Sequence, residues 1–185
     1  MKFTPGKIIE KIIVNGKEVV FRYPKMSDLD GMLKYINRLT KERAPIGLQR
    51  RMKIKGQKAY LKGVLNDMKE GKKTNICVIV DCKFMGAGDV WKINKDATAH
   101  VSEIGIALDK SVRGLGIGTR LMELLIEHAR KHYKAKIIRL DVYSYNKIAQ
   151  GLYKKMGFVP AGKIPKGCRT KGGKYYDDII MVKEL

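Results

Sequence analysis

Two different periodicities meet in the middle of the chain. Along residues 102–108 apolar positions alternate with small or charged ones, which predicts a strand with one buried face. Its apolar set is Ile104, Ile106 and Leu108. From residue 119 onward apolar positions recur at steps of three and four, which predicts an amphipathic helix reaching about His132. We therefore expect a strand, a short loop and a helix in succession.

The rest of the chain follows the same two patterns. Apolar-rich runs at residues 7–14 and 17–23 flank Asn15-Gly16, a pair suited to a type I′ turn, so they predict a hairpin. Ser27 and Asp30 form an approximate capping box for a helix, and a second amphipathic helix should end at Gly71. The other expected elements are strands at residues 76–80, 84–93, 137–143, 158–163 and 174–183, and a short helix from Asn146 to Gly157.

We expect these elements to form one domain. The 185 residues are enough for one substantial core and too few for two ordinary domains. We expect a single domain over residues 1–185 whose hairpin, at about residues 7–23, is an N-terminal extension. Gly86 and Gly88 inside an expected strand indicate a bend or a close approach of backbone.

The loop between the central strand and its helix is rich in glycine and arginine. It reads Arg113-Gly114-Leu115-Gly116-Ile117-Gly118-Thr119-Arg120. Unpaired amides and a partial positive charge at a helix start suit a phosphate or pyrophosphate, and glycines let a ligand reach them. A plain tight turn is the alternative. The dinucleotide fingerprint and the Walker pattern both fit poorly.

Charge and cysteine content narrow the class of protein. Thirty-nine basic and eighteen acidic side chains leave a net charge of +21, which should attract acidic partners, nucleic acid among them, or serve solubility alone. The three cysteines are Cys77, Cys82 and Cys168, and they show neither a disulfide framework nor zinc spacing. We find no signal peptide and no membrane-spanning run, so we expect a cytoplasmic protein without membrane association.

Two motifs in order point to a family. The first is Arg-x-x-Gly-x-Gly at Arg113, Gly116 and Gly118. The second, Asn-x-x-Ala-x-x-x-Tyr-x-x-x-Gly-Phe, comprises Asn146, Ala149, Tyr153, Gly157 and Phe158. Together they resemble the GNAT superfamily of N-acetyltransferases, and the ending at residues 172–181 resembles one branch of it. The resemblance implies an α/β fold (α+β, with a mixed sheet) whose sheet is flanked by helices and whose central strands splay apart to admit acetyl-CoA as co-substrate, with no metal.

The resemblance also implies a set of cofactor-binding residues. Backbone groups of residues 106–108 would pair with the pantetheine arm, and the amides of residues 113–119 would hold the pyrophosphate. The full set is Ile106, Ala107, Leu108, Arg113, Gly114, Leu115, Gly116, Ile117, Gly118, Thr119, Asn146, Ala149 and Tyr153. Asn146 could instead merely cap its helix.

Two side chains are the catalytic candidates. The resemblance makes Tyr153 the acid that protonates the departing thiolate, since a phenol with a pKa of about 10 is protonated at neutral pH. A core aromatic is the alternative. Glu103 is a carboxylate in an otherwise apolar strand, so it could accept the ammonium proton, and burial would raise its pKa. A structural ion pair is the other interpretation of Glu103, and Asp177, Asp178 and Glu42 remain alternative bases.

We therefore expect an enzyme that transfers the acetyl group of acetyl-CoA to a primary amine by direct attack in a ternary complex. The acceptor stays open between a small molecule, an amino acid and a protein amino group, and homodimer formation is equally open. The rival hypothesis is a basic RNA- or ribosome-associated binding protein with an acetyltransferase-like fold. The basic residues Arg50, Arg51, Lys53 and Lys55 could contact an acidic substrate or coenzyme phosphates, or form a solvated loop.

Overall fold

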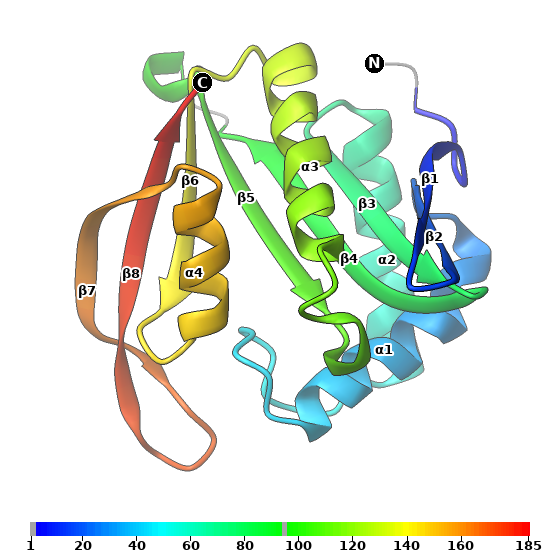
Figure 1. Ribbon diagram of the computed structural model, residues 1–185, viewed down its shortest axis with the longest axis horizontal. Coiled ribbons are helices and arrows are strands. Elements are labelled where there is room, and N and C mark those ends of the chain that lie inside the picture. Colours follow the sequence, from blue (N-terminus) through cyan, green and yellow to red (C-terminus); the bar gives the residue numbers. More distant parts are fainter. Residues whose placement is uncertain (1–2, 94–95) are drawn as a thin grey trace.

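Eight strands form one mixed sheet in the order β1-β2-β3-β4-β5-β6-β8-β7, in a computed structural model that describes residues 3–93 and 96–185 (Figure 1). The strands are β1 (Ile8–Val14), β2 (Lys17–Arg22), β3 (Lys73–Val80), β4 (Lys83–Lys92), β5 (Val101–Leu108), β6 (Ile137–Tyr143), β7 (Val159–Arg169) and β8 (Tyr175–Glu184). The helices are α1 (Leu29–Lys41), α2 (Ile54–Lys69), α3 (Ile117–Tyr133) and α4 (Lys147–Lys155). The predicted α/β class with a mixed sheet is confirmed. Residues 1, 2, 94 and 95 of the predicted domain lie outside the described residues.

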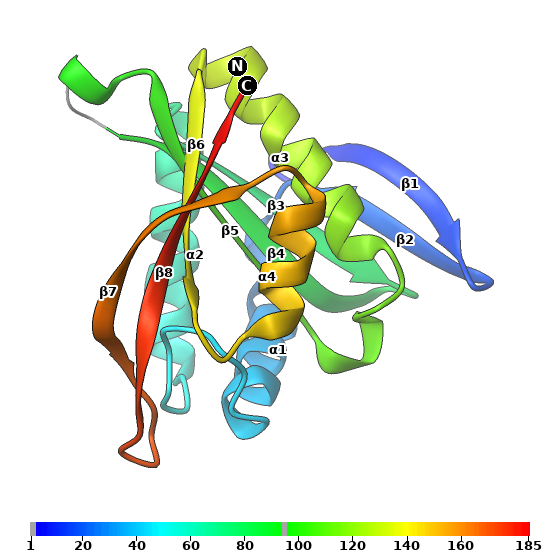
Figure 2. The same cartoon turned by 60° about the vertical axis from the view of Figure 1, so that its left-hand side comes forward.

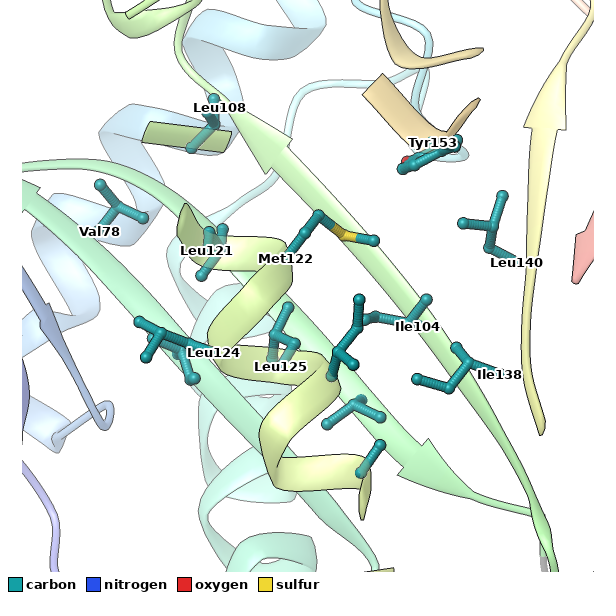
Figure 3. Close-up of a cluster of buried hydrophobic side chains, with 14 of the residues drawn as sticks. Val78, Ile104, Leu108, Leu121, Met122, Leu124, Leu125, Ile138, Leu140 and Tyr153 are labelled. Carbon is teal, nitrogen blue, oxygen red and sulfur yellow. The ribbon is translucent and has the colours of Figure 1, made fainter. Parts of the chain in front are cut away.

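The helices form a layer on each face of the sheet. Helices α1 and α2 lie behind it and α3 and α4 in front of it, as the two views show (Figures 1 and 2). The core on the α3 side gathers leucines of the helix against β3, β5 and β6 (Figure 3). Apolar positions at steps of three and four place Leu121, Leu124 and Leu125 on this buried side, so the helix forms because its apolar stripe is covered.

Helix α3 lies unusually close to the sheet at Gly88. A Cβ at this position would lie 2.6 Å from Leu125 Cδ1 and 2.8 Å from Ile106 Cγ2, closer than real contacts allow. The atoms nearest to this Cβ belong to side chains of α3 and β5, so side chains and not a second backbone approach Gly88 closely. The absent side chain of Gly88 lets α3 pack against β4 and β5.

The N-terminal hairpin is part of the sheet. Asn15 and Gly16 both have positive φ, at 50° and 76°, which joins β1 to β2 as predicted. Strand β2 in turn pairs antiparallel with β3, from Val19↔Val80 to Arg22↔Cys77. The extension thus lengthens the sheet at the edge remote from β7.

The start of α1 differs from the prediction. The Ser27 and Asp30 capping box is wrong: a 3-10 turn at Met26–Asp28 precedes the helix, and the Lys25 amide donates to Asp28 Oδ2 at 2.8 Å. Asp28 is held in place by Arg22, whose guanidinium donates to both carboxylate oxygens at 2.8 and 2.5 Å. A tertiary ion pair, which local sequence cannot reveal, therefore selects the capping residue.

Some boundaries also shift. Helix α3 begins at Ile117 rather than residue 119, β3 begins at Lys73 rather than residue 76, and β7 reaches Arg169 instead of ending near residue 163. The pairing of β7 with β8 contains two register shifts, which interrupt the alternation on which the strand prediction depends.

Strands β5 and β6 diverge in the centre of the sheet. They pair in parallel only at Val101↔Ile137, Ser102↔Ile138 and Glu103↔Arg139. On its other side β5 stays paired with β4 up to Leu108. From Ile104 onward the β6 side of β5 therefore faces a gap, and this is the splay that the family resemblance implies.

Candidate active site

Two cavities meet at the splay between β5 and β6. One, of about 590 Å³, lies between the start of α3 and α4, and we call it the loop cavity. The other, of about 670 Å³, is lined by Asp89, Asp141 and Asp178, and we call it the acidic cavity. The residues lining both are Pro45, Ile46, Ile106, Ala107, Asn146 and Tyr153. The two spaces thus open onto one place on β5.

The loop cavity ends at the N-terminus of α3. Gly116 is the N-cap residue and has φ +78° and ψ −14°, a left-handed conformation that costs a residue with a Cβ about 1–2 kcal/mol. The turn aims the first helical amides, with their partial positive charge, at the cavity. Gly118 lines the cavity too, and a Cβ there would lie 3.3 Å from Leu108 Cδ1. Such a cradle suits an anionic group close to backbone.

The structure brings together most of the predicted cofactor-binding residues. Those lining the loop cavity are Ile106, Ala107, Leu108, Arg113, Gly114, Gly116, Gly118, Thr119, Asn146, Ala149 and Tyr153. Leu115 and Ile117 do not line it. Ile117 is only 1% exposed because its side chain turns into the core beneath the loop.

The two loop arginines are already engaged. Arg113 donates to the Leu108 carbonyl at 2.9 Å and forms an ion pair with Glu42. Arg120, the last residue of the glycine-rich stretch, reaches Glu10 of β1 at 2.6 Å and Glu123 at 2.7 Å. Lys147 and Lys155, which sequence reasoning missed, are exposed and line the cavity from α4.

Tyr153 lies where the two cavities join. It projects from α4 between β5 and β6 (Figure 3), is 5% exposed, and packs against Phe158 with ring centroids 6.0 Å apart. Burial raises the pKa of its phenol to about 12, so the hydroxyl carries its proton at neutral pH. Both interpretations of this residue, a packed aromatic and a proton donor, fit this position.

Asn146 combines its two predicted positions. Its Oδ1 accepts from the Ala149 amide at 3.3 Å, which caps α4, while the residue lines both cavities. Within the described part of the chain its side-chain amide nitrogen has no hydrogen-bond partner. That donor is therefore available to a ligand.

The acidic cavity is built from carboxylates and aromatic rings. Asp89 comes from β4, Asp141 from β6 and Asp178 from β8. The aromatic residues lining it besides Tyr153 are Tyr35, Tyr60, Trp91 and Tyr143. No lysine or arginine is among its described lining residues, although the chain carries 39 of them. A protonated amine is the group that such a lining favours.

Asp178 differs from the other two carboxylates. Asp89 accepts from Asn75 at 2.9 Å and lies 3.3 Å from Lys73 Nζ, and Asp141 lies 3.6 Å from Arg139. The Oδ1 atom of Asp178 is buried and has no hydrogen-bond partner among the described residues. Burial, and then the charge of Asp141, raise the pKa of Asp178 above its ordinary value. This carboxylate can therefore take up a proton, and no described hydrogen-bond donor of the protein occupies its Oδ1.

The other candidate carboxylates lie elsewhere. Glu103 lines neither cavity, and its Oε1 is 3.3 Å from Arg139 Nη2. Asp177 accepts from Lys163 at 2.9 Å, a hydrogen bond that lowers its pKa, and Glu42 pairs with Arg113. The sequence shows the Asp177-Asp178 pair, but only strand register decides which of the two faces the cavity.

The segment between α1 and α2 supplies lining that the sequence did not indicate. Leu48 and Met52 line the acidic cavity, and Asn37 fixes this loop by exchanging hydrogen bonds of 2.8 and 3.1 Å with the Met52 backbone. Arg50, Arg51 and Lys53 of the same segment are exposed, and Lys55 lies in the first turn of α2. No periodic pattern marks this loop, so only its contacts reveal its place.

The described residues contain neither a metal-binding cluster nor a membrane-spanning helix. Over residues 3–93 and 96–185, no three His, Cys, Asp or Glu residues are placed so that they could hold a metal ion. His128 lies 3.0 Å from the Tyr23 hydroxyl and 2.7 Å from the Leu124 carbonyl. None of the described helices combines the length and apolarity needed to cross a membrane.

Comparisons with known proteins agree with this geometry. The sequence model of the Acetyltransferase (GNAT) family matches residues 38–158. A spermine/spermidine N(1)-acetyltransferase of Bacillus subtilis is 31% identical over 78 residues, which are 42% of this chain and only 45% of that relative, so the match spans less than half of its length.

Two solved structures resemble the whole fold. The ribosomal L7/L12 alpha-N-protein acetyltransferase RimL, in complex with coenzyme A, superposes with a TM-score of 0.82 over 97% of this chain and 98% of its own, at 14% identity. The microcin C7 self-immunity acetyltransferase MccE, in complex with acetyl-CoA and AMP, gives a TM-score of 0.77 over 90% and 92%, at 19% identity. At these identities the likeness shows the fold.

Proposed function

Because this chain belongs to the acetyltransferase (GNAT) family, we propose that it is an N-acetyltransferase that transfers the acetyl group of acetyl-CoA to a primary amine. The observation that carries this proposal is the meeting of two cavities at Tyr153. One cavity suits a phosphate-bearing donor and the other a cationic acceptor. Two substrates placed on either side of one point can react directly in a ternary complex.

The loop cavity fits coenzyme A. The amides after Gly116 would hold the pyrophosphate, and Lys147 and Lys155 would add charge for the phosphates. The unpaired edge of β5 at Ile106 offers backbone groups to an amide-bearing chain. When bound, acetyl-CoA supplies an activated acetyl group as a thioester. RimL and MccE were solved with coenzyme A and acetyl-CoA, which supports this assignment.

Side chains around the junction would handle the protons. Asp178 accepts one proton from the acceptor ammonium, which leaves a neutral amine able to attack. The amide N–C bond then forms as the C–S bond breaks. Tyr153 gives its proton to the departing sulfur and regains one from the nitrogen. A backbone amide near Ile106 would donate to the carbonyl oxygen as negative charge develops on it.

We favour Asp178 over Glu103 as the base because of their surroundings. Asp178 lines the acidic cavity, its buried Oδ1 has no hydrogen-bond partner among the described residues, and its pKa is raised. Glu103 would have to act through water and leave Arg139, to which it is paired. The predicted role of Glu103 as the base remains a proposal, and the substitution Glu103→Gln distinguishes it from the role proposed for Asp178.

The location and assembly belong to the same proposal. The cysteines are free thiols among the described residues, which suits the expected cytoplasmic location. The outer strands of the sheet are β1 and β7, and a homodimer that pairs sheet edges would use one of them. The acceptors named for relatives, a polyamine and a ribosomal protein, are both amines.

Two measurements test the function. Calorimetric titration should show saturable binding of acetyl-CoA, and a thiol reagent should detect release of coenzyme A when an amine panel is added. The panel needs free amino acids, polyamines and peptides with free N-termini. Absence of acetyl-CoA binding at about 1 mM would refute the proposal.

A further inference from the structure

Two exposed segments next to the acidic cavity carry the opposite charge. Residues 43–53 and 166–175 together contain eight lysines and arginines and no acidic residue. We call them the basic arch. Its cations are Arg43, Arg50, Arg51, Lys53, Lys166, Arg169, Lys171 and Lys174, and all eight are exposed. None of them forms an ion pair within the described residues, so their charge is uncompensated.

The two halves of the basic arch are joined in space. Gln49 Nε2 donates to the Arg169 carbonyl at 2.6 Å, across 120 positions of sequence. The loop after α1 and the tip of the β7–β8 hairpin accordingly lie beside each other in both views (Figures 1 and 2). The arch is thus made by two distant parts of the chain that contact each other.

The arch borders the acidic cavity directly. Leu48 and Met52, which line the cavity, lie within a few residues of the arch cations in the same loop. On the other side, aromatic rings lead outward from the cavity. Tyr143 stacks on Tyr145 at 5.8 Å and Tyr145 contacts Tyr176 at 4.5 Å, between ring centroids in each case. Lys174 Nζ lies 5.5 Å from the centre of the Tyr176 ring.

Charge therefore changes sign between the acidic cavity, which three aspartates line, and the eight exposed cations of the arch. From this we propose that the acceptor is the free N-terminal amine of a polypeptide whose following residues are acidic. The proposal rests on the proposed function and names its acceptor. The ammonium enters the acidic cavity, and the anionic side chains behind it contact the arch. An extended chain advances about 3.3 Å per residue, so the second to about the sixth residues can lie over the arch.

Other amines fit this charge distribution poorly. A polyamine carries ammonium groups along its whole length, so the part outside the cavity would meet the arch cations. A free amino acid has its carboxylate beside its amine and leaves the arch without a partner. Nucleic acid would suit the arch, but its exocyclic amines are not protonated at neutral pH and would gain nothing from the aspartates.

The test uses three peptides with the same first two residues, followed by four glutamates, four glutamines or four lysines. Coenzyme A release is followed at about 50 mM and about 500 mM salt, with spermine and alanine as further acceptors. We expect kcat/KM for the acidic peptide to exceed that for the basic peptide by about 100-fold at low salt. High salt should reduce the ratio to within about fivefold, because it screens exposed charges.

Charge reversal gives a matched comparison. Arg50→Glu/Lys171→Glu removes two arch cations, and Lys17→Glu/Lys83→Glu makes the same net change on exposed hairpin residues far along the sheet. The arch variant should lose about tenfold in kcat/KM for the acidic peptide and keep its rate for the glutamine peptide. The control variant should change either rate by less than about twofold.

Several outcomes would overturn the inference. Equal rates for the three peptides would do so while leaving the acetyltransferase proposal intact, and so would preference for spermine or alanine. The arch would instead be assigned to nucleic acid if the arch variant lost binding of a mixed-sequence single-stranded RNA while the three peptides were acetylated at equal rates. If a protein that binds acetyl-CoA released coenzyme A equally fast with and without an amine, water would be the acceptor. That result would refute the proposed function and this inference with it.

Discussion

Replacing Asp178 by asparagine should separate catalysis from stability. The amide has the shape of the carboxylate, and Asp178 Oδ1 has no hydrogen bond to lose among the described residues. What disappears is the capacity to accept a proton. Because a positioned general base contributes about 10²–10⁴-fold, kcat/KM should fall by at least about 100-fold, which is about 2.7 kcal/mol of transition-state stabilisation.

The stability of the same variant should move the other way. The pKa of Asp178 is raised in the folded protein, mainly by burial and then by Asp141. The folded state therefore prefers the protonated acid, and stability is lost as pH rises from the unfolded pKa through the folded one. At pH 7 the ionised side chain opposes folding, and Asp178→Asn removes that cost. We expect a melting temperature equal to or above that of the wild type.

The assay pairs this variant with Glu103→Gln. Both are measured by coenzyme A release with one saturating amine, and by thermal unfolding at pH 7. Glu103 and Arg139 form a partly exposed pair, worth at most about 1 kcal/mol, so Glu103→Gln should keep its rate within about threefold. The reasoning is refuted if Asp178→Asn retains half of the wild-type kcat/KM or if Glu103→Gln shows the larger loss.

Three further predictions concern the acid, the loop and the scaffold. Tyr153→Phe should lower kcat by about 100-fold or more with little change in acetyl-CoA affinity. The control Tyr143→Phe alters a residue that lines only the acidic cavity and should leave kcat largely unchanged. Equal losses of kcat in the two variants would contradict the acid role. Gly116→Val forces a β-branched residue to φ +78° and should weaken acetyl-CoA binding about tenfold in calorimetry; unchanged affinity would argue against the cradle. Asp28→Ala leaves Arg22, 13% exposed, without its bidentate partner and should lower the free energy of unfolding by about 3–5 kcal/mol in urea; a loss below about 1 kcal/mol would refute this.

Local pattern was a reliable guide wherever one face of an element is buried. The alternation at residues 102–108 and the period of the following helix predicted β5 and α3 closely, because the same side chains that set the period form the core. The glycine at position 116 was informative for a related reason, since its conformation is a property of the backbone itself. The capping of α1 was missed because Arg22, on another element, selects Asp28.

Site prediction depended on whether the chemistry was consecutive in sequence. The loop from Arg113 to Thr119 and the Asn146 to Phe158 motif are contiguous, and together they supply eight of the eleven predicted residues that line the loop cavity. The other three, residues 106–108, lie on β5. The acidic cavity instead draws single residues from β4, β6, β8 and an aperiodic loop. The sequence around each of these residues does not indicate which other residues will lie beside it in the fold.

The sequence by itself therefore determined the class of fold, the glycine turn at the start of α3 and the tyrosine at the junction, because local periodicity, backbone conformation and a contiguous motif encode them. Only the tertiary structure decided which carboxylate of the Asp177-Asp178 pair lines the acidic cavity, and that this cavity and the basic arch adjoin. Strand register rotates Asp178 inward and leaves Asp177 to pair with Lys163, and one bond from Gln49 brings together segments 120 residues apart. These features depend on contacts between residues that are far apart in the sequence, so local sequence patterns do not predict them.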